Sequence, residues 1–197
     1  MRKILGSIFL FSFLFSVVHA QDNGISPQAI GVSFFLNDFS SAERLRTTSL
    51  SKVIADKSWA KFNEMAPGIA ITYFKGLQKH LDFSSTLAAS FLDYPFPTRA
   101  SKGNDNLLLE ADASINLKMF SDDYWFTPYF SAGLGGSKYE SFYGAFIPVG
   151  LGLKVNFFDE AAIFTSMQYR IPVTYENTNY HFMYSIGVSG VIGKTKK

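Results

Sequence analysis

The stretch LLLEADASINLK, residues 107–118, decides the fold because its side chains alternate between two kinds. The odd positions from Leu107 to Leu117 are apolar, whereas the even positions from Glu110 to Lys118 are polar or charged. Neighbouring side chains of a β-strand point to opposite faces, so a period of two predicts a strand with one apolar and one polar face. Strands of soluble sheets usually have about five or six residues, so this length is more typical of a tilted strand that crosses a bilayer.

The same period of two recurs along most of the chain. It predicts strands over residues 29–39, 67–76, 81–92, 107–118, 125–137, 145–156, 161–173 and 180–189. The connections over 77–80, 120–124 and 158–160 are short and polar, and those over 40–66, 93–104, 138–142 and 174–179 include two long ones. We therefore predict an all-β fold, an eight-stranded antiparallel up-and-down transmembrane β-barrel, with both termini on the periplasmic, short-turn side.

The first long connection has a local pattern of its own. Leu50, Val53, Ile54 and Lys57 follow Ser49 with helical spacing, so a short helix is an option for this segment.

The chemistry of the two strand faces distinguishes a membrane barrel from a soluble one. A soluble ligand-binding barrel encloses apolar side chains, whereas here the polar face carries charges and many small residues such as Gly133 and Gly150. The apolar face is continuous, and such a surface suits lipid better than water. Aromatic residues gather near the predicted strand ends and favour two interfacial girdles. The turn-side girdle comprises Phe120, Tyr124, Trp125, Phe126, Phe157 and Phe158, and the loop-side girdle Phe39, Tyr94, Phe96, Tyr139, Phe142, Tyr143, Tyr175 and Tyr180.

Residues 1–20 have the pattern of a signal peptide. Arg2 and Lys3 precede an apolar run, and the run ends in Val18-His19-Ala20, so we expect cleavage after Ala20. Residues 21–197 then form one barrel domain with 16 basic and 16 acidic side chains. A neutral chain argues against a nucleic-acid partner. Because the sequence has no cysteine, no disulfide contributes to stability.

Four segments carry a family resemblance: residues 31–39 (GVSFFLNDF), 67–76, 128–135 (PYFSAGLG) and 168–173 (QYRIPV). They resemble the N-terminal barrel of the outer membrane protein A family, in the form common in Bacteroidetes. The resemblance covers most of residues 28–193 and implies an eight-stranded outer-membrane barrel with a structural or adhesive role. Many relatives continue into a peptidoglycan-binding domain, which we expect this chain to lack because it stops at Lys197.

Motifs for catalysis or metal binding are weak. Gly193-Lys194-Thr195 resembles the end of a phosphate-binding loop, but Val188 stands where the first glycine is required. The three histidines have no metal-ligand spacing. Some small outer-membrane barrels are lipid-modifying hydrolases with Ser and His, but His181 and Ser185 are two pleats apart on one strand. We therefore expect no cofactor, no metal site and no catalytic residues.

Charges on the inward face are the best functional lead. They form a candidate lumen charge network of Glu110, Asp112, Lys118, Lys154 and Arg170. From the direction of their strands, we expect Glu110, Asp112 and Arg170 in the loop-side half of the barrel and the two lysines towards the turn side. Charges in a narrow lumen must pair or stay hydrated, so the network is either a structural plug or the gate of a small pore. We expect a Gram-negative outer-membrane protein with a structural or surface-display role; the alternatives are a narrow or gated pore and a lipid-modifying enzyme. Its expected partners are outer-membrane lipids, the barrel-assembly machinery and an unidentified surface partner at the loops.

Overall fold

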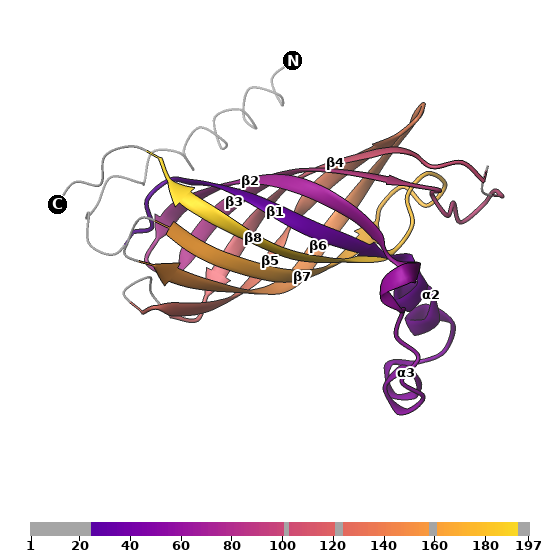
Figure 1. Cartoon of the computed structure of the whole chain (residues 1–197), viewed down its shortest axis with the longest axis horizontal. Helices are drawn as coiled ribbons and strands as arrows, with labels where there is room; N and C mark the ends of the chain where they lie inside the picture. The colour runs from indigo at the N-terminus through magenta and orange to yellow at the C-terminus, as the bar shows by residue number, and fades with distance from the viewer. Residues whose placement is uncertain (1–24, 101–102, 121–123, 158–160, 193–197) are drawn as a thin grey trace, which may run out of the picture.

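The computed structural model describes residues 25–100, 103–120, 124–157 and 161–192. Within these residues, eight antiparallel strands follow one another around a closed barrel, in which β1 also pairs with β8 (Figure 1). The strands are β1 (Ala29–Asp38), β2 (Ala66–Gln78), β3 (Leu81–Leu92), β4 (Asn106–Lys118), β5 (Phe126–Tyr139), β6 (Phe142–Phe157), β7 (Ala161–Pro172) and β8 (His181–Val191). The predicted up-and-down barrel is confirmed. Several predicted segments lie outside the described residues: the signal peptide, residues 101–102 of the second long connection, residues 121–123, the whole turn over 158–160, and Gly193-Lys194-Thr195.

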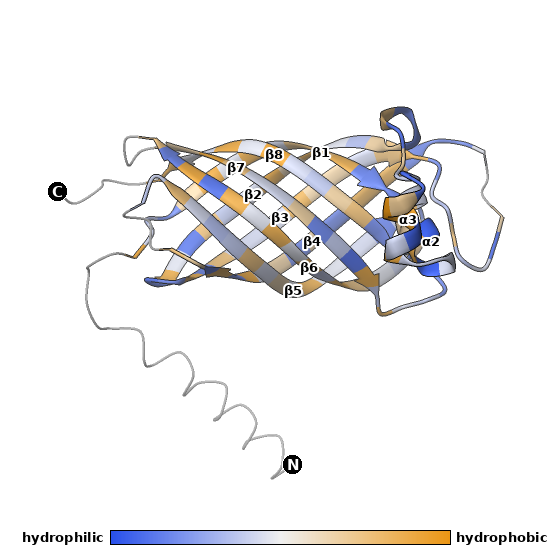
Figure 2. Ribbon diagram, turned by 90° about the horizontal axis from the view of Figure 1, so that it is seen from below, coloured by the Kyte–Doolittle hydropathy of each residue, from blue (hydrophilic) through white to orange (hydrophobic). Residues whose placement is uncertain are grey.

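The predicted alternation of faces is also confirmed. Along β4, the even positions from Leu108 to Lys118 are buried in the barrel interior, and the odd positions face outward. Outward positions on the other strands carry exposed large apolar side chains, among them Val32, Ile71, Leu134, Leu151 and Ile186. Hydrophobic residues are spread along the whole barrel wall in Figure 2. Among the described residues, no helix is long and apolar enough to cross a membrane.

The first long connection contains two helices, α2 (Phe39–Thr47) and α3 (Leu50–Ala55), and a 3-10 turn, η1 (Phe62–Glu64). The short helix expected after Ser49 is confirmed, with the Ser49 side chain as its N-cap. The expected strand over 29–39 ends one residue early, because the Asp38 carboxylate accepts a hydrogen bond from Ser41 N at 2.8 Å and caps α2. Helix α2 was not predicted.

The third outer connection is shorter than predicted. Residues 138–142 were expected as a loop, but β5 and β6 remain paired up to Tyr139 and Phe142. Only Glu140 and Ser141 connect them, and Glu140 has a positive φ of 51°. The hairpin tightens here because the backbone of Glu140 enters the left-handed region, which tight turns require.

Candidate functional site

Large inward side chains and glycines together fill the lumen. Each of several aromatic rings lies so close to an inward glycine that a Cβ there would come within 3.0 Å of the ring. The pairs are Phe35 with Gly68, Phe146 with Gly135, Tyr129 with Gly152 and Phe164 with Gly31. An eight-stranded barrel leaves only a narrow interior, so these glycines make the space that the rings occupy.

A buried ion-pair cluster, which we call the Arg170 cluster, lies at the loop-side end of the lumen. Arg170, on β7, has 0% exposure, and its guanidinium contacts two carboxylates that both lie on β4. Its Nη1 lies 2.6 Å from Glu110 Oε2, and its Nη2 donates a hydrogen bond to Asp112 Oδ2 at 3.2 Å. The guanidinium carbon lies 4.8 Å from the Phe146 ring centroid. A guanidinium has donors arranged in a fork, so it can serve two carboxylates at once.

His181 completes the Arg170 cluster. Its Nε2 lies 3.4 Å from Glu110 Oε1, and its Nδ1 lies 3.1 Å from the carbonyl oxygen of Asn179. The imidazole ring packs on Phe39, with 4.6 Å between the ring centroids. Within the described residues, the polar partners of His181 are therefore a carboxylate and a carbonyl, and no serine hydroxyl is among them.

Aromatic side chains close the lumen above the Arg170 cluster. Tyr94 and Tyr139 are buried, with 5.2 Å between their ring centroids, and Phe39 packs edge-on against Tyr94 at 5.4 Å. The Tyr139 hydroxyl donates to Leu92 O at 3.0 Å, and the Tyr94 hydroxyl accepts from Asn179 N at 2.7 Å. Burial raises the pKa of the Tyr94 phenol. These rings form a lid over the Arg170 cluster.

This lid corrects part of the loop-side girdle expected from the sequence. Phe39, Tyr94 and Tyr139 pack over the lumen instead of facing outward, because inward ring packing buries their apolar area. Tyr143 and Tyr175 are exposed as expected. At the turn-side end, Phe120, Tyr124, Trp125 and Phe157 are exposed as expected, and Phe158 lies outside the described residues.

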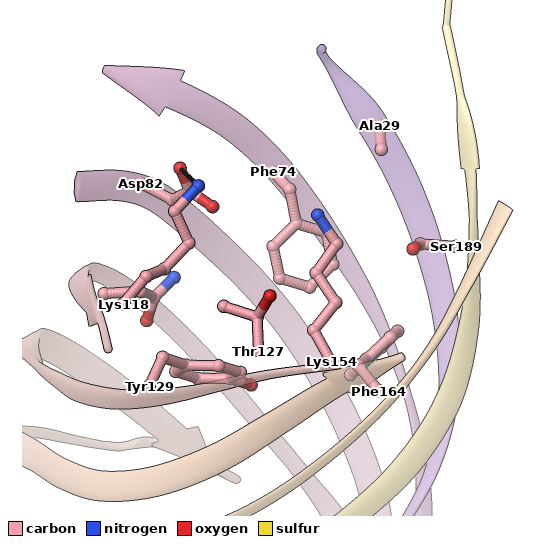
Figure 3. Close-up of a pocket in the computed structure, with 10 residues that line it drawn as sticks. Ala29, Phe74, Asp82, Lys118, Thr127, Tyr129, Lys154, Phe164 and Ser189 are labelled. Atoms are coloured by element: carbon pink, nitrogen blue, oxygen red, sulfur yellow. Dashed lines mark ion pairs between the residues drawn. The ribbon is translucent and has the colours of Figure 1, made fainter. Parts of the chain in front are cut away.

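A second charged cluster, the Lys118 cluster, lies at the turn-side end of the lumen (Figure 3). Lys118 Nζ lies 2.9 Å from Asp82 Oδ1 and donates to Ser26 Oγ at 2.7 Å. The Ser26 hydroxyl in turn donates to Asp82, at 3.1 and 3.2 Å from its two carboxylate oxygens. Asp82, Lys118, Thr127 and Lys154 line a cavity of about 20 Å³.

The middle of the lumen is polar and almost filled. Hydroxyl and amide groups of neighbouring strands pair along its wall: Thr72 with Thr86 at 3.2 Å, Asn116 with Ser84 at 3.0 Å, and Ser166 with Ser185 at 2.7 Å. The cavity between them measures about 30 Å³. A water molecule needs about 10–15 Å³ of such space, so this cavity has room for isolated waters and not for a continuous column.

In the structure the charge network forms two groups, in the halves of the barrel expected from the sequence. Glu110, Asp112 and Arg170 meet at the loop-side end, whereas Lys118 and Lys154 lie at the turn-side end. Two partners in these groups were not predicted from the sequence. Asp82 is the carboxylate partner of Lys118, and His181 is a partner of Glu110. Both residues stand at inward positions of their strands, so the period of two was a signal that could have identified them.

Within the described residues, no group of three or more His, Asp or Glu side chains is placed to hold a metal ion.

Comparison with known proteins finds the fold but not a family. A scan against models of protein families gives no match, and neither does a search of curated proteins. The structure is similar to Neisserial surface protein A (NspA), with a TM-score of 0.55 and 15% identity over 86% of this chain and 100% of that chain. It is similar to the outer membrane protein OprG from Pseudomonas aeruginosa, with a TM-score of 0.57 and 10% identity over 86% and 98% of the two chains.

A third similar structure is Ail, the attachment invasion locus protein of Yersinia pestis, solved in complex with the heparin analogue sucrose octasulfate. Its TM-score is 0.50, with 13% identity over 86% of this chain and 99% of that chain. At these identities the likeness shows a shared fold, that of eight-stranded outer-membrane β-barrels.

Proposed function

We propose that this chain spans the outer membrane as a closed barrel with a structural, surface-display role and no enzymatic activity. One observation carries the proposal: the wall is apolar on the outside, while the interior holds buried ion pairs. A soluble barrel has the opposite arrangement, since water solvates charges and disfavours a broad apolar surface. The similar outer-membrane barrels support the same conclusion.

The barrel wall has the dimensions that a membrane requires. A transmembrane strand needs about 9–11 residues at a tilt of about 45°, and the shortest strand here, β1, has 10 residues. Pairing of β1 with β8 closes the sheet, so the described barrel presents no open sheet edge to lipid. The proposal includes residues 1–20 as a signal peptide cleaved after Ala20, and assembly by the barrel-assembly machinery.

Electrophoresis tests the barrel directly. Folded in detergent or lipid vesicles, the protein should migrate differently on a gel when it is left unboiled, because the hydrogen-bonded barrel resists the denaturing detergent until it is heated. Far-ultraviolet circular dichroism should show β-structure. Identical migration of the two samples together with a helical spectrum would refute the proposal.

The orientation follows from the connections. The long connections that leave β1 and β3 should face outward from the cell, and the short turn between β2 and β3 should face the periplasm. The sequence has no cysteine, so single cysteines can be introduced as unique labels. Lys57→Cys should react with an impermeant reagent on intact cells, and Lys79→Cys only after lysis. The reverse pattern would show that the orientation is wrong.

A gated pore is the second candidate, favoured by the polar side chains that line the lumen between the two charged clusters. In the present structure the Arg170 cluster and the lid above it close that lumen. Conduction would require these groups to move, so the structural role is the better-supported function.

A further inference from the structure

The connection between β1 and β2 is a folded unit, which we call the α2–α3 platform (residues 39–65). The Ser41 hydroxyl accepts a hydrogen bond from Ala60 N at 2.8 Å, and Arg44 Nη1 donates to Ser58 O at 3.1 Å. Arg44 also pairs with Glu64 at 3.2 Å. A hydrogen bond from Lys61 N lowers the pKa of the Glu64 carboxyl, and so does the Arg44 charge. The platform therefore has fixed internal contacts.

Despite this packing, the platform exposes large apolar side chains. Leu50 is 52% exposed, Ile54 57% and Phe62 73%. Leu50 and Ile54 are four residues apart in α3, so they lie on the same side of the helix. Trp59 is also exposed, whereas Val53, which lies between Leu50 and Ile54 in the sequence, is buried. The exposed side chains thus have no partner surface in the folded unit itself.

The same platform carries an excess of positive charge. It contains five basic side chains (Arg44, Arg46, Lys52, Lys57 and Lys61) and three acidic ones (Glu43, Asp56 and Glu64), whereas the chain after residue 20 is neutral. Exposed apolar side chains interspersed with lysines are the composition of segments that lie in the interface of an anionic membrane.

The position of the platform matches a membrane surface. In Figure 1, α2 lies at the rim of the barrel and α3 lies farther out, to the side of the barrel wall rather than over its mouth. Helix α2 packs against β8, and the Arg46 guanidinium lies 4.0 Å from the Tyr180 ring centroid. A segment that overhangs the wall of an inserted barrel lies above the surrounding lipid.

The platform is continuous with the outer wall. Tyr180 stacks with Tyr169 at 5.8 Å between ring centroids, Tyr169 contacts Phe182 at 4.8 Å, and Phe182 stacks with Tyr184 at 6.0 Å. These rings on the outer side of β7 and β8, of which Phe182 is buried and Tyr169 and Tyr184 are half-buried, therefore connect the barrel wall to Arg46. Aromatic rings of this kind favour the level of the lipid headgroups.

We propose that the α2–α3 platform binds the anionic, phosphate-bearing headgroups of the lipid leaflet on the loop side of the barrel. Its lysines contact the phosphates, and its exposed apolar side chains enter the interface. The inference rests on the proposed function, since it needs the barrel wall to be surrounded by lipid. The platform would then fix the height and tilt of the barrel in the leaflet.

The two tryptophans of the chain allow a test in which each reports separately. Trp125→Phe leaves Trp59 in the platform as the only tryptophan, and Trp59→Phe leaves Trp125 at the turn-side end. Each variant is folded into phosphatidylcholine vesicles with and without phosphatidylglycerol, containing phosphatidylcholine spin-labelled near the headgroup. We expect Trp59 emission to shift to the blue and to be quenched more strongly when the anionic lipid is present.

Charge reversals in the Trp125→Phe background identify the cause. Lys52→Glu with Lys57→Glu should remove most of the additional quenching. The control is Lys75→Glu with Lys138→Glu, which changes the net charge by the same amount at exposed positions outside the platform. This control variant should retain the additional quenching. The inference would be overturned if Trp59 quenching changed neither with the lipid charge nor with the charge reversals in the platform. The exposed surface would then be better explained by a protein partner. If Trp125 is quenched while Trp59 is not, the barrel is inserted and only the inference fails; if neither is quenched, the proposed function fails.

Discussion

The two ends of the lumen are closed by different chemistry. At the loop-side end, Arg170 serves two carboxylates beneath the aromatic lid. At the turn-side end, Lys118 pairs with Asp82 and donates to Ser26, and Lys154 lines both the 20 Å³ cavity and a neighbouring one of about 70 Å³. Contact with water lowers the free-energy cost of enclosing a charge. At a site without water, well-placed hydrogen-bond and ion-pair partners must take the place of that hydration. The comparison therefore predicts a rigid closure at the loop-side end and a more hydrated, tolerant one at the turn-side end.

Removal of Arg170 should have the largest effect. Arg170→Ala leaves Glu110 and Asp112 buried without their cation, which typically costs about 3–5 kcal/mol. The free energy of unfolding, measured with urea in lipid vesicles, should fall by about 3–5 kcal/mol. Adding Glu110→Gln and Asp112→Asn should recover much of the loss, because the orphaned charges are then absent. An Arg170→Ala variant as stable as the wild type would mean that the loop-side cluster is already hydrated.

Removal of Lys118, at the turn-side end, should reduce the free energy of unfolding less than removal of Arg170. Lys118→Met removes the 2.9 Å ion pair from Lys118 to Asp82, but Ser26 still donates to the carboxylate and the adjacent cavity has room for water. A loss of about 2 kcal/mol is expected, within the range for a buried group left short of a partner. Urea unfolding under the same conditions gives the comparison. A loss equal to that of Arg170→Ala would remove the difference between the two ends.

Packing around the loop-side cluster provides a finer test. In Gly135→Ala, the new Cβ would lie 2.4 Å from the Phe146 ring, the same ring on which Arg170 rests. Overpacking typically costs about 1–3 kcal/mol, and the lower part of that range is expected if the ring can shift. Gly136→Ala is the control, because its nearest neighbour is 3.5 Å away. Equal thermal stability of the two variants would show that the ring is not tightly held.

Local patterns explain why so much of the fold was predictable. The period of two in residues 107–118 depends only on neighbouring residues, and it correctly placed Glu110 and Asp112 inside the barrel. Their location in the same half of the barrel as Arg170 followed from strand direction alone. The aromatic residues were harder, because a ring at a strand end can be exposed on the outside, as Tyr143 is, or fold over the lumen, as Tyr94 does. That choice depends on contacts from distant strands, which no local pattern records.

The most direct test of the account is the electrical conductance of planar bilayers that contain the folded wild-type protein. The Arg170 cluster, its aromatic lid and the nearly filled lumen are expected to keep the barrel closed to ions. Insertion is verified by the gel shift of protein recovered from the same preparation. We predict no defined single-channel openings from the wild type, and openings in Arg170→Ala only if loss of the cluster also frees the lid. Regular openings of the inserted wild type would contradict the structural role and establish a pore.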